Sequence, residues 1–385
     1  MDFALTPEQT ERREEQRSWL RQTLPPGWRG SGSTLSDEDW EFAQQYNRAL
    51  GAKGWMAPGW PKEHGGMGLG SLNQLLWDEE MSYHYVPIGN RFQGVNHIGP
   101  LIIHTGTPEQ QAQHLPPIIR GEITWGQGYS EPGSGSDLAS LQTRADRDGD
   151  DYVLNGSKIW SSNAHLAEWM FVLSRTDQES PKHRGISLLL VPMDTPGITV
   201  RPIENIAGDA DFNQVFFENA RVPRTALLGE ENRGWYLAVQ LLDDERASSG
   251  DTGGLKRQLD DLRPFLRGHP QRAIVAHRYA ALQTELAAAR WLGLRAAWCA
   301  DQGMPFSNES SATKLMSSEL AQRISNFAIE ALGLPGALRE ASYGAVSDGL
   351  AAKRHLWSIM ETIGGGTSEV QRSIIATRGL GLPRA

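Results

Sequence analysis

The residues with the clearest chemical potential begin with a glycine- and serine-rich turn, Ser130-Glu131-Pro132-Gly133-Ser134-Gly135-Ser136-Asp137. Glycine lets the main chain come close to a bound group, and the turn offers several hydroxyl and backbone N–H groups. Clustered N–H groups in a concave turn bind anions. The turn is therefore a candidate cradle for a phosphate or another anionic group.

Two turn-forming dipeptides follow, Asp148-Gly149 and Asn155-Gly156, and strand-forming residues flank each of them. This pattern predicts two β-hairpins. The second hairpin would deliver Ile159-Trp160-Ser161-Ser162-Asn163, an aromatic side chain with hydroxyl groups beside it. An indole suits a planar ring ligand. The alternative interpretation is a surface β-meander with ordinary turns, in which Trp160 is a core residue of a strand.

Length and composition narrow the class of protein. The chain has 385 residues, 39% of them hydrophobic and 22% charged, which is typical of a globular protein with two or three domains. A net charge of −9 argues against nucleic acid as the main partner, but it does not exclude a small anionic ligand. Cys299 is the only cysteine, which excludes an intramolecular disulfide and a metal site of several cysteines. We expect no bound metal.

The compartment follows from the apolar runs of the sequence. The opening residues are polar and lack the apolar core of a signal peptide. The longest apolar run, Ile186 to Met193, is too short to cross a membrane. We therefore expect a cytoplasmic protein without a membrane partner.

Three stretches with different periodicity follow one another along the chain. Residues 1–122 carry apolar side chains at helical intervals and predict an N-terminal helical domain. Residues 123–226 contain short β-type runs between turns, such as Ile186–Val191, and predict a middle β domain. Residues 227–385 are helical again, and the stretch 286–298 is apolar nearly all round, which is typical of a bundle interior or an oligomer interface. The predicted fold class is α+β.

This order of elements, with the Ser130–Asp137 turn opening the β part, resembles the acyl-CoA dehydrogenase family. Two other stretches resemble signatures of that family: Gly364–Arg372 with the ending Arg378–Arg384, and Trp60–Gly66 near the start. Each motif is weak alone, but three of them in the family's order argue against chance similarity. The resemblance implies an N-terminal helical domain, a middle β-barrel or sandwich and a C-terminal four-helix bundle.

The resemblance also implies a reaction and a cofactor. Members of the family bind FAD, oxidise an acyl-CoA thioester to the trans-2-enoyl-CoA and pass the electrons to an electron-transfer flavoprotein. Carried over position by position, six residues would contact the cofactor. These are Ser130 and Ser136 at the flavin and its pyrophosphate, Trp160 and Ser162 against the isoalloxazine, and Thr367 and Glu369 near the diphosphate and adenosine.

The reaction removes a proton from the α carbon, so it needs a carboxylate in a dry site. In many members this base directly precedes the Gly-Thr of the closing signature. Here that position is Gly365, whose backbone N–H can still donate to the thioester carbonyl. A minority of members carry the base in a Leu-x-x-Glu-Arg setting on the first long helix of the C-terminal domain. Leu242-Asp243-Asp244-Glu245-Arg246 matches that setting.

The resemblance thus assigns the base to Glu245 and places Asp243 and Arg246 along the acyl-CoA channel. The alternative for a glutamate in such a helix is a solvated residue or one that pairs locally.

Two departures from the family concern oligomerisation. Many members carry an Arg-x-x-Phe-Gly motif that reaches a neighbouring subunit's flavin, and Arg267–Arg272 lacks it. The usual Gln-x-x-Gly-Gly segment is replaced by Glu330–Gly336. Both changes resemble an actinobacterial-type branch, some of whose members act on steroid side-chain or other bulky CoA esters. Some of those assemble as heteromers with fewer flavins than subunits, so a homodimer, a homotetramer and a heterotetramer all stay open.

Two other functions compete with acyl-CoA dehydrogenation. One is a different flavin reaction on the same fold, such as nitroalkane oxidation or flavin monooxygenation. The other is a non-catalytic partner subunit of a heteromeric dehydrogenase, which would gain activity only on mixing with a second chain.

Overall fold

The computed structural model describes residues 3–30, 36–87, 92–248, 252–340 and 342–383, with the backbone alone at 92 and 243–248. The chain forms two compact units. One unit comprises Ser31–Leu69 and Pro87–Asp244, and it contains the β-sheet. The other comprises Met1–Gly30, Gly70–Val86 and Glu245–Ala385, and its described elements are helical. The predicted α+β class is therefore confirmed, whereas the three domain boundaries stay predictions.

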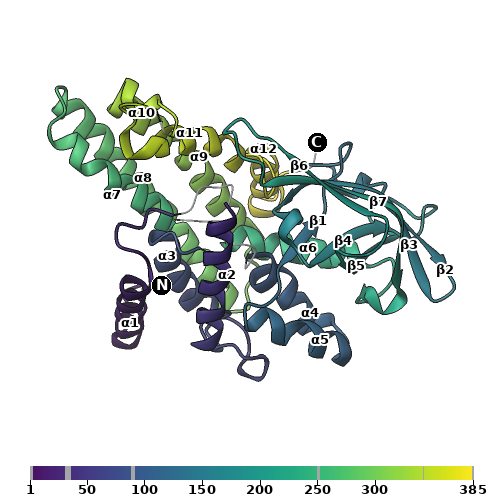
Figure 1. Cartoon of the computed structure of the whole chain (residues 1–385). Helices are drawn as coiled ribbons and strands as arrows, with labels where there is room; N and C mark the ends of the chain where they lie inside the picture. Colours follow the sequence, from purple (N-terminus) through teal and green to yellow (C-terminus); the bar gives the residue numbers. More distant parts are fainter. Residues whose placement is uncertain (1–2, 31–35, 88–91, 249–251, 341, 384–385) are drawn as a thin grey trace. The chain divides into compact units, whose positions relative to one another are not determined.

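The middle of the chain forms one eight-stranded sheet (Figure 1). The strands follow the order β6-β7-β3-β2-β4-β5-β8, and β1 pairs in parallel with β4. The two central strands β4 and β5 are buried along almost their whole length, which agrees with their continuous apolar sequences. The strands are β1 (Trp125–Gly128), β2 (Arg144–Asp148), β3 (Asp151–Ser162), β4 (Trp169–Arg175), β5 (Ile186–Pro192), β6 (Ile198–Ile203), β7 (Phe212–Pro223) and β8 (Leu227–Leu228).

One of the two predicted hairpins is correct and the other is wrong. Asp148 pairs with Asp151, so Gly149 lies in a tight turn between β2 and β3, as predicted. Asn155-Gly156 instead lies inside β3, where the pairing with β7 shifts register. Gly156 has a φ of 144°, and a Cβ there would lie 2.7 Å from the Cα of Thr143. The glycine therefore serves a β-bulge with a close backbone approach.

Trp60 explains the first family-like motif, Trp60–Gly66, in physical terms. Its ring is 4% exposed, and its Nε1 donates to the carbonyl of Val95 at 2.9 Å. A Cβ at Gly66 would lie 2.1 Å from the Trp60 carbonyl oxygen, and one at Gly99 would lie 2.0 Å from the indole. Both glycines are therefore needed for the chain to wrap around this tryptophan.

The helices of the sheet-containing unit lie before and after the strands in sequence. Capping boxes at Ser36 and Thr107 fix the starts of α2 and α5, as a Ser or Thr before an acidic or amide residue at the third position favours. The side chain of Gln110 in α5 donates to the carbonyls of Thr225 and Leu227 at 2.8 and 2.9 Å, which attaches α5 to β8. The helices are α2 (Asp37–Ala52), the π-helical η2 (Phe92–Ile98), α4 (Gly99–Thr105), α5 (Pro108–Ile119) and most of α6 (Gly234–Ser248).

The helical unit has its own apolar core between α7, α8 and α9, to which Leu259, Leu286 and Phe327 contribute. The predicted apolar stretch 286–298 lies in α8, which buries Ala289 and Leu294 but leaves Trp291 51% exposed. The helices are α1 (Pro7–Thr23), α3 (Ser71–Tyr83), α7 (Thr252–Arg267), α8 (Arg272–Asp301), α9 (Ser307–Leu332), α10 (Leu334–Ala337), α11 (Leu350–Glu361) and α12 (Ser368–Ile374). Within the described ranges, no helix is long and apolar enough to span a bilayer.

Candidate functional site

The Ser130–Asp137 turn is open to solvent at its tip. Glu131 and Ser134 exchange two backbone hydrogen bonds of 2.9 and 3.0 Å, which close the turn. A Cβ built at Gly133 or Gly135 would meet no other atom within 4 Å. The protein's own packing therefore does not require these glycines, and they leave room for a bound group to approach the backbone.

The serines of this turn divide into two kinds. Ser134 is buried, and its hydroxyl donates to the carbonyls of Asp137 and Leu138 at 3.0 and 3.1 Å. Ser136 is exposed and Ser130 is half-buried. Ser134 thus stabilises the turn itself, whereas Ser130 and Ser136 are the two that a ligand can reach.

A buried ion pair, which the sequence did not reveal, anchors the turn to β3. The Nζ of the fully buried Lys158 donates to the Glu131 carboxylate at 2.7 Å and to the Tyr129 carbonyl at 3.1 Å. Glu131 also accepts from the backbone N–H groups of Gln142 and Thr143 at 2.6 and 2.9 Å. The partners lie 27 residues apart, so no local signal could have paired them.

Burial and pairing act in opposite directions on this pair. Burial lowers the pKa of Lys158 to about 8, although the neighbouring Glu131 carboxylate works against that shift. Burial alone would raise the pKa of Glu131, but the Lys158 ammonium and the two backbone N–H groups hold it below its ordinary value. Both groups therefore stay charged at neutral pH.

Trp160 lies in a bulge of β3 directly beyond this ion pair. The pairing of β3 with β7 shifts register between Lys158 and Ser161, and Trp160 adopts a left-handed φ of 62°. Such a backbone costs a tryptophan about 1–3 kcal/mol. The indole is 57% exposed and packs edge-on against Phe212, with ring centroids 6.2 Å apart. The expectation that it might be a core residue is therefore wrong.

The turn and the bulge are joined directly. The N–H of Ile159 donates to the Ser130 carbonyl at 2.9 Å. Ser161 is buried and donates to the Gln127 carbonyl at 2.9 Å, while Ser162 is half-buried. One face of the sheet-containing unit thus brings together an open turn with hydroxyls and an exposed aromatic ring.

The closing signature forms a glycine loop that leads into α12. Gly365 and Gly366 both have left-handed φ values, 65° and 94°, and a Cβ at Gly366 would lie 2.6 Å from the Gln371 amide nitrogen. The buried Gln371 donates to both glycine carbonyls at 3.1 Å, and Lys314 donates to the Gly366 carbonyl at 2.9 Å. Sequence reasoning missed Gln371 and Lys314, which fix the shape of this loop.

Thr367 and Glu369, both in the helical unit, lie at the start of α12. The Thr367 hydroxyl caps the helix by accepting from the Val370 N–H at 3.2 Å. Glu369 is exposed, and hydrogen bonds from its own N–H and from the Thr367 hydroxyl hold its pKa below the ordinary value. Both residues are accessible, and their contact with a cofactor stays a prediction.

The predicted base falls in the last turns of α6. This helix begins at Gly234, where a Cβ would lie 2.5 Å from the backbone nitrogen of Leu188 in β5. Ala238 and Leu241 are buried along the helix. Asp243, Glu245 and Arg246 belong to the same helix, but their side chains lie outside the described residues.

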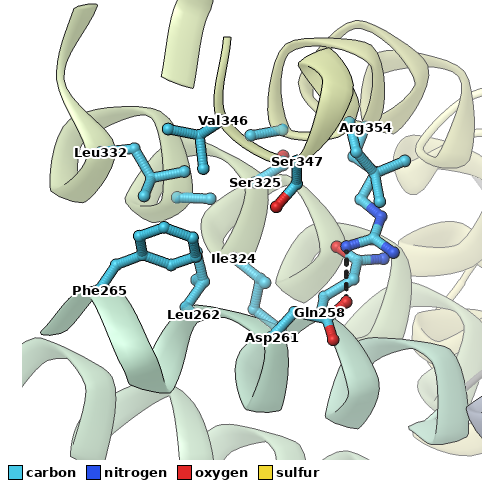
Figure 2. A pocket seen from close by; sticks show the side chains of 13 residues that line it. Gln258, Asp261, Leu262, Phe265, Ile324, Ser325, Leu332, Val346, Ser347 and Arg354 are labelled. Atoms are coloured by element: carbon cyan, nitrogen blue, oxygen red, sulfur yellow. Dashed lines mark hydrogen bonds and ion pairs between the residues drawn. The ribbon is translucent and has the colours of Figure 1, made fainter. Parts of the chain in front are cut away.

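The helical unit also holds a small cavity between α7, α9 and α11, shown in Figure 2. Its volume is about 30 Å³, enough for about one or two water molecules. Phe265, Ile324 and Leu332 line its apolar side, and Arg354 closes it through an ion pair with Asp261 at 3.4 Å. The cavity is too small for a flavin ring or an acyl chain.

Comparison with known proteins agrees with this arrangement. The N-terminal, middle and C-terminal domain models of the acyl-CoA dehydrogenase family match residues 6–122, 126–220 and 232–380. Acyl-CoA dehydrogenase IpdE1 of Mycobacterium tuberculosis is 37% identical over 97% of both chains, and FadE26 of the same organism is 35% identical over the full length of both.

Solved structures are equally similar over the whole length. The structure titled Tcur3481-Tcur3483 steroid ACAD covers all of both chains with 34% identity and a TM-score of 0.92. The ChsE4-ChsE5 complex from Mycobacterium tuberculosis covers all of both chains with 34% identity and a TM-score of 0.88. With all three domain models in order and full-length relatives at this identity, the chain belongs to the acyl-CoA dehydrogenase family, the FAD-dependent oxidoreductases that act on the CH–CH bond of acyl-CoA thioesters.

Proposed function

We propose that this chain binds FAD along the Ser130–Asp137 turn and against the Trp160 indole. The observation that carries the proposal is the exposed tryptophan in a left-handed bulge, hydrogen-bonded through Ile159 to an open glycine turn. The turn has unobstructed backbone near Gly133 and Gly135 for a pyrophosphate, and Trp160 has a free face for a planar ring. Ser136 and Ser162 would donate from beside them.

On the other unit, Thr367 and Glu369 would hold the diphosphate and adenosine side of the cofactor. The start of a short helix offers N–H groups there. The left-handed Gly365 and Gly366 keep the loop free of side chains. This part of the proposal rests on the match to the family's closing signature and on the accessibility of both residues.

The chemistry divides between the cofactor and the chain. When bound, FAD accepts the hydride that leaves the β carbon. Glu245 takes the proton from the α carbon, and the N–H of Gly365 donates to the thioester oxygen, where negative charge develops. Position 245 follows Leu241 by four residues and Ala238 by seven, so the helical repeat assigns it to the face of α6 that carries these two buried residues. Asp243 and Arg246 would line the channel of the acyl-CoA.

The proposed substrates are CoA esters with a bulky, steroid-derived acyl group, and the proposed electron acceptor is an electron-transfer flavoprotein. Support for the substrate class comes from the solved relatives titled steroid ACAD, which match the chain over its full length. Two of the similar structures are complexes of two named chains. A heteromer with a second, related chain is therefore the proposed assembly.

The test of this function starts from the visible spectrum of the chain purified alone, with the flavin counted per chain. We expect steroid side-chain CoA esters to bleach the bound flavin anaerobically, and short straight-chain esters to bleach it more slowly. Flavin that is absent from the chain alone but appears on co-expression with a second family member would assign the partner-subunit role. Bound flavin that is reduced by a nitroalkane and by none of the esters would contradict the proposal.

Replacement of Trp160 by alanine tests the flavin contact. The loss of a stacked indole is expected to weaken FAD binding about tenfold, which corresponds to about 1.4 kcal/mol. The measurement is the dissociation constant of FAD for the apoprotein, followed by flavin fluorescence. Trp291→Ala is the matched control, because that indole is 51% exposed on α8 in the other unit. Equal affinities for both variants would remove Trp160 from the flavin site.

A further inference from the structure

The helical unit contains a larger cavity that the proposed reaction does not use. It lies between α1, α3, α7 and α8, and its volume is about 410 Å³. Small-molecule sites commonly have volumes of about 300–1,000 Å³. Cationic side chains dominate its lining: Arg13, Arg17 and Arg21 from α1, Lys256 from α7, and Arg290 from α8.

Two buried carboxylates from α3 organise these cations. Glu80 is 2% exposed and accepts two hydrogen bonds of 2.8 Å from Arg17 and another from Arg13. Glu79 is 6% exposed and accepts from Arg290 at 2.6 and 2.9 Å. The guanidinium groups are therefore held in place before any ligand arrives, which reduces the entropy lost on binding.

The positive charge exceeds what the helices need for their own packing. Five cations face two carboxylates in the lining, in a chain whose net charge is −9. The nearest additional carboxylates are Glu14, 2.6 Å from Arg17, and Asp260, 2.5 Å from Lys256. Asp260 is shared with Arg263 at 3.0 Å, so an excess of two positive charges remains.

Arg21 is the part of this excess that no internal contact accounts for. It is exposed at the rim, and it makes no ion pair with the part of the chain that the structure describes. Arg13, Arg17 and Arg21 follow one another at intervals of four, so they share one face of α1. Like charges at this spacing destabilise a helix. An anion held between them would offset that cost, and guanidinium forks match the oxygens of phosphate.

We propose that this cavity, which we call the α1 anion site, binds a small phosphorylated molecule. The phosphate lies between Arg21 and Lys256 at the rim, and Arg13 and Arg290 supply the positive field behind it. All residues of the site belong to the helical unit, and none of them is a proposed contact of FAD or of the acyl-CoA. Binding would connect α1 to α7 and raise the thermal stability of this unit.

The test uses the full-length protein saturated with FAD, so that the flavin site is occupied. The probes are inorganic pyrophosphate and adenosine 5′-monophosphate, titrated by calorimetry at constant ionic strength. We expect both to bind, with a dissociation constant that Arg21→Gln and Lys256→Gln each raise about tenfold, the loss of one charge-assisted hydrogen bond. Tighter binding of the nucleotide would identify a nucleoside phosphate as the ligand class, and tighter binding of pyrophosphate an inorganic one.

Arg278→Gln is the matched control, because Arg278 lies on α8 away from the cavity and pairs with Glu330. It should leave both dissociation constants unchanged. Arginine-specific dicarbonyl labelling gives an independent readout, in which pyrophosphate protects Arg21 and leaves Arg278 reactive. Absence of binding at millimolar concentration would overturn the proposal, as would equal binding by all variants and the wild type.

Discussion

A Glu245→Gln variant is expected to lose nearly all reduction of bound flavin by substrate while it keeps its flavin. General base catalysis commonly contributes about 10²–10⁴-fold to a rate, and glutamine is close to the shape of glutamate but cannot accept the α-proton. The closing signature offers no substitute, because its commoner base position is Gly365. The measurement is the anaerobic bleaching rate of the flavin after rapid mixing with the CoA ester that reduces the wild type fastest.

The control for this variant is Glu230→Gln, which removes an exposed glutamate shortly before α6 and should leave the rate unchanged. Flavin content and the spectral change on ester binding show whether the Glu245 variant still holds cofactor and substrate. Bleaching at the wild-type rate would contradict the assignment of the base. If the wild type needs a second chain for activity, the comparison is made in the assembled heteromer.

The sequence carried enough information for the elements that depend on local pattern. The strands appear where short apolar runs were predicted, because a run such as Ile186–Val191 suits a strand that is covered on both faces. The tight turn at Gly149 follows from residue type alone. The open turn at 130–137 was also predicted, because adjacent serines and glycines have few other structural uses.

The features that escaped prediction depend on partners far along the chain. Asn155-Gly156 carries the same local signal as a hairpin, and only its pairing with β7, some sixty residues later, makes it a bulge. The exposure of Trp160 follows from the second register shift in the same pairing. A strand lysine is ordinarily solvated, so the burial of Lys158 against Glu131 had no signal in its neighbours. Side-chain patterns thus located the site, whereas long-range pairing shaped it.

This buried pair leads to the second large expected effect. Lys158→Met should destabilise the sheet-containing unit by about 3–5 kcal/mol, because it leaves the Glu131 carboxylate buried without its counter-charge. The turn that Glu131 anchors should loosen as well, so FAD retention should fall together with stability. The measurements are thermal unfolding followed by near-ultraviolet circular dichroism and the dissociation constant of FAD.

Two comparisons separate the charge from the packing. Lys182→Met removes the exposed partner of Asp137 at the end of the same turn, and an exposed ion pair contributes less than about 1 kcal/mol. The double variant Glu131→Gln with Lys158→Met removes both buried charges and should recover much of the lost stability, because no uncompensated charge remains. If the double variant also recovers FAD binding, the pair acts on the cofactor site by holding the turn in shape. If Lys158→Met unfolds like the wild type, the pair does not anchor the turn, and the open shape of the turn must come from the backbone alone.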